Sequence, residues 1–300
     1  MDDVLVLWDI DGTLLNADGV GRDLYGAVFL QLFGRSLSAY APMAGRTDRA
    51  IILETLGLAG VDEPRRYVDP FIAGLGEHAP SVRSAVADRG HALPGAAAVL
   101  ATLAAAFDGA AAPFLAAPPL TAQPVTAQPA AAPFMPTAPL AVPSITAQPL
   151  TAQPAGVPAM AAGSADGAGV RQAGRIHQSV LTGNIRSVAE VKLAALGLRE
   201  WLDLCIGAYG DDHEDRTELV EVARRRATAV HGRSAAAFGG AATVVIGDTP
   251  LDISAALGAG ARAVGVATGS YSADDLAMAG ADAVLPDLAD TAAVLRALLP

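Results

Sequence analysis

Short apolar runs alternate with longer segments in which apolar residues recur at helical spacing. The first run, residues 4–8, is apolar throughout and leads into two aspartates and a glycine, which predicts a buried strand followed by a turn. Further runs predict strands at residues 177–181, 204–208, 243–246, 263–269 and 283–285, and a last helix at about 287–299. Strands that alternate with helices predict a parallel sheet covered on both faces, so we expect an α/β fold with a Rossmann-like core.

Residues 17–88 interrupt this alternation, because they show helical patterns only. Apolar positions recur at helical spacing over residues 20–32, and Thr47 is a suitable N-cap for a second helix. A third pattern contains Pro70 and Pro80, which we expect to break or kink it. A single crossover helix usually follows a strand of a parallel sheet, so we interpret residues 17–88 as an inserted helical cap.

The remaining residues, 1–16 and 89–300, are predicted to form the core, with an insertion of unusual composition at 109–173. No charged residue lies between Asp108 and Asp166, whereas 12 of the 20 prolines do, and Thr-Ala-Gln-Pro occurs four times there. So much proline excludes a helix or a central strand, so we predict a disordered or polyproline-like loop. Because it joins the end of a helix to the start of a strand, we expect it at the amino ends of the strands.

Charge and composition narrow the classes of function. A formal net charge of −11 argues against a surface for nucleic acid or anionic membrane, which needs basic side chains. The single cysteine, Cys205, excludes an internal disulfide, fits a reducing compartment and is expected to be buried in its apolar run. No apolar span is long enough for a membrane helix, and the acidic start of the chain is unlike a signal peptide. We therefore expect a cytoplasmic protein that acts on a small molecule.

Polar residues follow three of the predicted strands at their carboxyl ends. They are Asp9 and Asp11, then Thr182, Gly183 and Asn184, and finally Asp248 and Asp252. Ligands of open parallel sheets bind beyond the carboxyl ends of the strands, so we expect these residues to share one crevice. Neighbouring carboxylates repel each other unless a cation lies between them, and as hard oxygen ligands they suit Mg²⁺. A hydroxyl and backbone amides at a helix N-terminus suit a phosphoryl oxygen.

These residues carry a family resemblance. Asp9-Ile10-Asp11-Gly12-Thr13 resembles the first motif of the haloacid dehalogenase (HAD) superfamily. Thr182-Gly183-Asn184 resembles its second motif, and Gly247–Asp252, with the pattern GDxxxD, its fourth. The resemblance covers the chain apart from about 109–173, and the helical insertion resembles the cap of the phosphoglycolate phosphatase and β-phosphoglucomutase branch. It therefore implies the HAD fold.

The resemblance also implies roles. Asp9 would attack phosphorus, and Asp11 would protonate the leaving oxygen and later activate water. Mg²⁺ would be held by Asp9, the backbone carbonyl of Asp11 and Asp248, with Asp252 as a further ligand or a partner of a metal-bound water. The phosphoryl group would be bound by Thr182 and by the amides of Gly183 and Asn184.

The third motif departs from the family, because the Lys-Pro pair that is frequent in this branch does not occur. Arg216, at the start of a helix, and Lys192 are the candidates for its cation. Lys192 lies about two turns into its helix, roughly 12 Å from the strand end, so we favour Arg216 and expect Lys192 to be a solvated charge or an ion pair. In the cap, Arg46 is the candidate for binding a substrate carboxylate or second phosphate, although a plain surface arginine fits equally well.

The residues together predict a Mg²⁺-dependent phosphatase that hydrolyses a small phosphorylated metabolite through an aspartyl-phosphate, with 2-phosphoglycolate as the leading candidate. A sugar-phosphate mutase would use the same residues. A non-enzymatic interaction protein that uses the Pro/Ala tract is a third interpretation, against which the intact set of Asp9, Asp11, Thr182 and Asp248 weighs. The presence of Asp11 also argues against a dehalogenase, because the dehalogenases of this superfamily lack the second aspartate.

Overall fold

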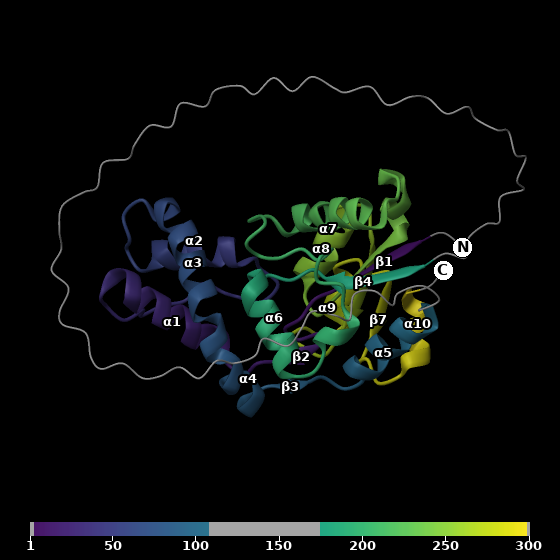
Figure 1. Ribbon diagram of the computed structural model, residues 1–300, viewed down its shortest axis with the longest axis horizontal. Helices are drawn as coiled ribbons and strands as arrows, with labels where there is room; N and C mark the ends of the chain where they lie inside the picture. The colour runs from purple at the N-terminus through teal and green to yellow at the C-terminus, as the bar shows by residue number, and fades with distance from the viewer. Residues whose placement is uncertain (1–2, 108–174, 299–300) are drawn as a thin grey trace, which may run out of the picture. The chain divides into compact units, whose positions relative to one another are not determined.

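A five-stranded parallel sheet forms the centre of the molecule in the computed structural model, which describes residues 3–107 and 175–298 (Figure 1). The strands are β1 (Val4–Trp8), β4 (Ile176–Val180), β5 (Thr243–Gly247), β6 (Arg262–Val266) and β7 (Ala283–Leu285), in the order β4-β1-β5-β6-β7. The predicted α/β class is therefore confirmed. The predicted loop at 109–173 lies outside the described residues.

The register of the central strands places their carboxyl ends side by side. Trp8 at the end of β1 pairs with Val180 of β4 and with Ile246 of β5. The residues that follow these strands consequently lie at the same edge of the sheet. Arg175 immediately precedes β4 and donates a backbone hydrogen bond to Asp3 at the opposite, amino-end edge.

Helices cover both faces of the sheet, as the alternation of strands and helices predicts (Figure 1). Val6 and Trp8 point into one apolar cluster, which includes α5 (Ala96–Phe107), α6 (Arg186–Ala195) and α10 (Thr291–Leu298). Leu5 and Leu7 point into the other cluster, which includes α7 (Arg216–His231), α8 (Pro250–Gly258) and α9 (Ala273–Met278). Because successive side chains of a strand point to opposite faces of the sheet, β1 contributes apolar side chains to both clusters.

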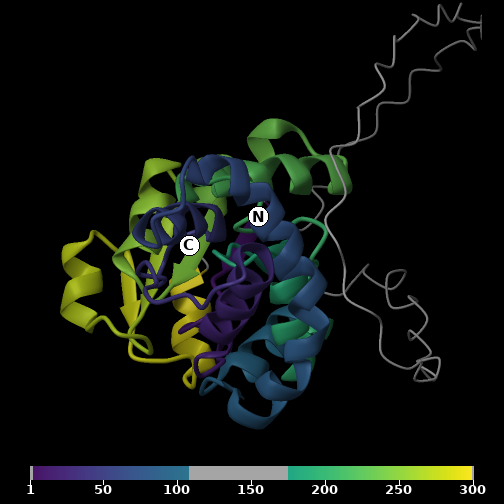
Figure 2. The same ribbon diagram turned by 90° about the vertical axis from the view of Figure 1, so that its left-hand side faces the viewer.

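Residues 17–88 contain helices and no strand. They form α1 (Val20–Phe33), α2 (Asp48–Leu58), α3 (Val68–His78) and α4 (Arg83–Arg89), with short 3₁₀ helices at Pro64–Tyr67 and Ala79–Val82. Buried side chains of α1, α2 and α3 share a third apolar cluster, and these helices lie together in both ribbon views (Figures 1 and 2). Where the chain leaves and re-enters the core, β2 (Leu15–Asn16) pairs antiparallel with β3 (His91–Ala92), a pairing that the sequence patterns did not predict.

The prolines of this helical unit behave differently. Pro70 was expected to break or kink its helix, but it does not break α3, because it lies in the first turn, where a backbone N–H has no intrahelical partner. Pro80 lies in the 3₁₀ helix between α3 and α4, as a helix breaker should.

Three other local predictions are wrong. Residues 204–208 form a turn with a single bridge, Leu181 to Ala208, instead of a strand, because Asp203 accepts hydrogen bonds from Cys205 and Ile206. Cys205 is exposed. The last helix begins at Thr291 and not at about residue 287. Asp290 precedes it, and its side chain accepts a hydrogen bond from the backbone N–H of Ala293.

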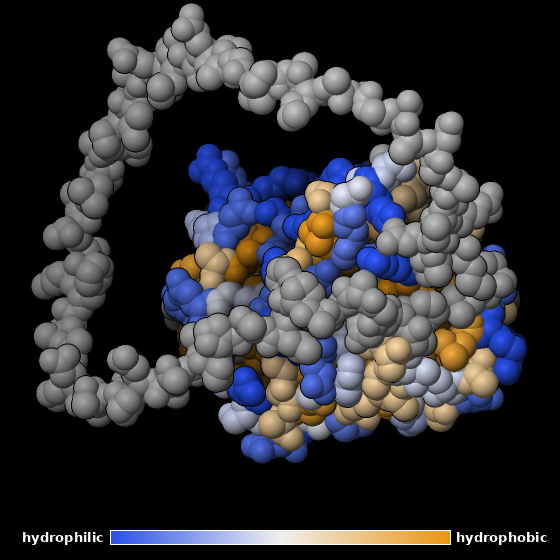
Figure 3. Space-filling model, turned by 45° about the vertical axis from the view of Figure 1, so that its right-hand side comes forward, coloured by the Kyte–Doolittle hydropathy of each residue, from blue (hydrophilic) through white to orange (hydrophobic). Residues whose placement is uncertain are grey.

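On the face seen in Figure 3, hydrophilic and hydrophobic groups of the described residues are intermixed. Large exposed apolar side chains such as Leu30, Val230 and Met278 come from different helices. Within the described residues, the helices lack the combination of length and apolar character that crossing a membrane requires.

Candidate active site

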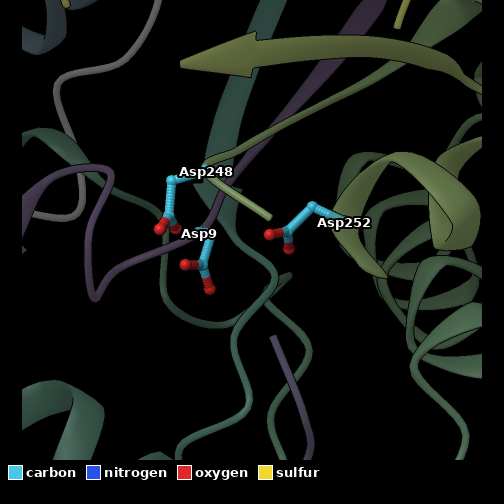
Figure 4. A group of neighbouring side chains, drawn as sticks. All are labelled: Asp9, Asp248 and Asp252. Carbon is cyan, nitrogen blue, oxygen red and sulfur yellow. The ribbon is translucent and has the colours of Figure 1, made fainter. Parts of the chain in front are cut away.

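Three carboxylates converge at the carboxyl edge of the sheet. Asp9 follows β1, Asp248 follows β5, and Asp252 lies in the first turn of α8 (Figure 4). One oxygen from each lies within 4.8 Å of the others, and their residues are only 5%, 4% and 0% exposed. The structure thus brings together three of the four residues predicted to surround a metal.

The turn after β1 presses against this cluster. Gly12 has a φ of 86°, and a Cβ at that position would lie 2.4 Å from Oδ2 of Asp248, so a side chain cannot fit there. Thr13 donates its hydroxyl to Asp248 at 3.3 Å. Gly269 is closer still, because a Cβ there would lie 1.7 Å from the same oxygen. The sequence patterns did not single out Gly269 as a site residue, although its position at the carboxyl end of the strand predicted over 263–269 was a usable signal.

Arg216 forms the cationic centre of the buried group. It begins α7, whose N-cap is Asp215, and is 7% exposed. Its guanidinium lies 2.7 Å from Oδ1 of Asp9 and 2.5 Å from Oδ1 of Asp252, and it donates to the carbonyl of Leu181 at 3.2 Å. Arg216 thus lies beside Asp9 and Asp252, and its role as the third-motif cation stays a prediction.

Lys192 also reaches the site, where it forms an ion pair with Asp11 and is not the solvated charge that was the other expectation. Its ammonium lies 2.8 and 2.7 Å from the two carboxylate oxygens of Asp11 and 2.8 Å from Oδ1 of Asn184. Lys192 is 4% exposed. A distance counted along the helix axis overstates the separation, because the side of α6 that carries Lys192 faces Asp11.

The predicted phosphate-binding loop lies between these two cations. The amide of Asn184 donates to Asp11 at 2.6 Å and to the hydroxyl of Thr182 at 2.9 Å. The backbone N–H of Asn184 also donates to that hydroxyl, at 3.2 Å, so a phosphoryl oxygen would have to replace this bond. A Cβ at Gly183 would lie 1.9 Å from the carbonyl oxygen of Arg46, which explains the glycine.

Burial and mutual repulsion control the acidity of the cluster. Burial raises the pKa of Asp9 well above its usual value, which Arg216 opposes and Asp252 and Asp248 reinforce. Burial, with repulsion from Asp252, raises the pKa of Asp248 to about 7. Burial opposes the charge of Arg216, but the carboxylates of Asp252 and Asp9 outweigh it and raise its pKa. Three buried carboxylates against one guanidinium leave negative charge uncompensated, so the donor set fits a hard divalent cation.

Arg46 lies at the rim of a cavity of about 380 Å³ that is also lined by Glu54, Glu214 and Asp215. Its guanidinium pairs with Glu54 at 2.7 Å and donates to the carbonyl of Pro42 at 3.1 Å. An anionic substrate group would therefore have to compete with Glu54 for Arg46. Substrate binding by Arg46 stays a prediction.

A family model and several solved structures are similar to this chain, and they share its fold. The HAD-hydrolase-like family model matches residues 218–291. A protein from Clostridium acetobutylicum, named as a predicted phosphatase, has a TM-score of 0.54 at 14% identity, over 99% of this chain and 100% of its own. A hydrolase from Pseudomonas syringae has a TM-score of 0.52 at 16% identity, over 98% of each chain.

A haloacid dehalogenase-like hydrolase from Streptococcus pneumoniae has a TM-score of 0.51 at 12% identity, again over 98% of each chain. No curated protein sequence matches the chain. At these identities the likeness concerns the fold. The family match over residues 218–291 includes the fourth motif, Gly247–Asp252, and agrees with the resemblance that the motifs predict.

Proposed function

We propose that this chain, which has the fold of the HAD-like hydrolases, is a Mg²⁺-dependent phosphomonoester hydrolase in which Asp9 forms an aspartyl-phosphate. The observation that carries the proposal is the convergence of Asp9, Asp248 and Asp252 beside the loop of Thr182 and Asn184. Such a site positions a phosphoryl group and neutralises its charge, which are the main requirements of phosphoryl transfer.

The metal would be held by the carboxylates of Asp9 and Asp248 and by the backbone carbonyl of Asp11. Bound there, Mg²⁺ would offset negative charge on the phosphoryl oxygens. Asp252 is engaged already, because its Oδ2 accepts from the backbone N–H and hydroxyl of Thr249 while Oδ1 pairs with Arg216. We therefore assign Asp252 to holding Arg216 and the metal-side waters in place.

The side chains divide the chemistry between them. Asp9 would attack phosphorus as the bond to the leaving oxygen breaks, and Asp11 would give that oxygen its proton. Lys192 and Asn184 hold the Asp11 carboxyl group in a fixed orientation. In the second half-reaction Asp11 would take a proton from the water that attacks the aspartyl-phosphate, which releases phosphate and restores Asp9.

The substrate would be a small phosphorylated metabolite, with 2-phosphoglycolate as the first compound to test. Residues 17–88 would act as the cap over the site, and the core would comprise 1–16 and 89–300. A sugar-phosphate mutase remains the second candidate, because only the acceptor of the phosphoryl group differs. A cytoplasmic location fits the single cysteine.

Phosphate release from a panel of small phosphate esters, with Mg²⁺ and with EDTA, tests the proposal. We expect Mg²⁺-dependent release by the wild type, abolished in Asp9→Asn and retained in Asp274→Asn, a matched control at an exposed position. Equal rates for Asp9→Asn and the wild type would contradict the mechanism. Absence of release, combined with conversion of glucose 1-phosphate, would instead favour the mutase.

A further inference from the structure

Asp48 is a buried carboxylate outside the catalytic cluster, at the start of α2. It is 7% exposed, whereas the other buried residues of α2 are apolar or threonine. Burying a carboxylate is costly unless it is well hydrogen-bonded. Thr47 already caps α2, because its hydroxyl accepts from the amide of Ala50, so capping does not account for Asp48.

Asp48 forms hydrogen bonds to the phosphate-binding loop on both sides of Asn184. Its Oδ2 accepts from the backbone N–H of Ile185 at 2.7 Å, and its own N–H donates to the carbonyl of Gly183 at 2.7 Å. Its Oδ1 accepts from the hydroxyl of Tyr25 in α1 at 2.6 Å. One residue of the helical unit therefore fixes the backbone that carries Asn184, and the Asn184 side chain in turn holds Asp11.

The backbones here touch without side chains between them. A Cβ at Gly210 would lie 1.7 Å from the carbonyl oxygen of Gly183 and 2.7 Å from the nitrogen of Asp48. Arg49 donates its N–H to the carbonyl of Gly210 at 3.2 Å. A displacement of the start of α2 would therefore displace the phosphate-binding loop as well.

We propose that Asp48 is a positioning residue that holds the phosphate-binding loop in its binding geometry while the helical unit is docked on the core. The inference rests on the proposed function, because its ligand is the phosphoryl group. Fixing the loop before the ligand arrives removes an ordering cost from binding. A carboxylate also interacts favourably with the N-terminus of α6, which begins next to Ile185.

The anionic form of Asp48 is needed for both acceptor bonds. Burial raises the pKa of Asp48 to about 6, although the hydrogen bonds from Tyr25 and Ile185 oppose this rise. Its carboxyl group is therefore mainly ionised at neutral pH and above, where both oxygens can accept. Asn at this position would keep the shape of the side chain but would present one NH₂ group to a donor.

Calorimetric titration of the full chain with inorganic phosphate, in the presence of Mg²⁺, tests the inference. We expect Asp48→Asn to bind phosphate at least about tenfold more weakly, a loss of about 1.4 kcal/mol. Arg65→Gln is the matched control, because it removes an exposed contact between the helical unit and Glu214, at 3.4 Å, without touching the loop. It should bind within twofold of the wild type.

A folded Asp48→Asn protein with unchanged phosphate affinity would overturn the inference, even if its Tm is lower, because a purely structural role predicts that result. If Asp48→Asn does not fold, Tyr25→Phe replaces it, with about threefold weaker phosphate binding and faster amide exchange at Ile185 expected. Unchanged values would again overturn it, as would a wild type that binds no phosphate. A wild type that binds phosphate but hydrolyses no ester would contradict only the hydrolase proposal.

Discussion

Replacing Arg216 by glutamine should destabilise the metal-free protein strongly. The substitution leaves Asp9 and Asp252 buried without their cation, with side chains only 8% and 0% exposed. Removing one partner of a buried ion pair costs about 3–5 kcal/mol, and we expect the upper end because two carboxylates share Arg216. For a chain of this size that loss corresponds to a Tm lower by roughly 8–20 °C.

Lys192→Gln provides the internal comparison. Lys192 is as deeply buried as Arg216, but its partner Asp11 has a side chain that is 42% exposed. Water can solvate that carboxylate once the ammonium is gone, so we expect a loss of only about 1–2 kcal/mol. The difference between the two losses in the free energy of unfolding thus measures the effect of burying the partner carboxylates.

Urea unfolding of both variants and the wild type, in EDTA and in excess Mg²⁺, measures these losses. Mg²⁺ should recover part of the stability of Arg216→Gln, because a cation among Asp9, Asp248 and Asp252 replaces some of the missing positive charge. Equal losses in EDTA would refute the reasoning from burial. Failure of Mg²⁺ to stabilise either the wild type or Arg216→Gln would contradict a metal site at these carboxylates.

Three further results are expected. Lys192→Met should lower kcat about 100-fold with KM within threefold in steady-state assays, because Asp11 loses its orientation; an unchanged kcat would remove Lys192 from the mechanism. In EDTA, protonated Asp248 stabilises the fold fully below about pH 4, and this stabilisation is lost as the pH rises through its pKa of about 7. Mg²⁺ should therefore raise Tm more at pH 8 than at pH 5. Equal increases in Tm at the two pH values would contradict this prediction. Gly269→Ala should weaken Mg²⁺ binding at least about tenfold by calorimetry, since its Cβ would displace Asp248, whereas Gly21→Ala, with open space at its Cβ, should match the wild type.

The sequence predicted the sheet and its functional edge because both depend on local patterns. An apolar run that ends in Asp or Thr places that residue at the carboxyl edge, and parallel pairing then aligns such residues from distant parts of the chain. Asp9, Thr182 and Asp248 could therefore be grouped without knowledge of the tertiary structure. The pairing of β4 and β5 with β1 brings them to that common edge.

The sequence predictions were wrong where the outcome depends on which side of a helix faces the core, or on whether a side chain is exposed to solvent. The reach of Lys192 depends on which side of α6 faces the core, and helical spacing alone does not specify that side. Residues 204–208 have the composition of a short strand, but hydrogen bonds to Asp203 turn the chain there and leave Cys205 exposed. Asp48 gave no distinctive signal, because an aspartate in the first turn of a helix is common for reasons of helix polarity.

The position of β1 between β4 and β5 has a consequence for how the protein is made. Val4 pairs with Ile176 and Leu5 with Thr243, so β1 leaves the ribosome long before the two strands that cover its edges. Such non-local pairing is slow, and it exposes an apolar strand in the meantime. A nascent chain that ends before Thr243 would have Asp9 but neither Asp248 nor Asp252, so metal binding should appear only late in synthesis, together with the completed sheet.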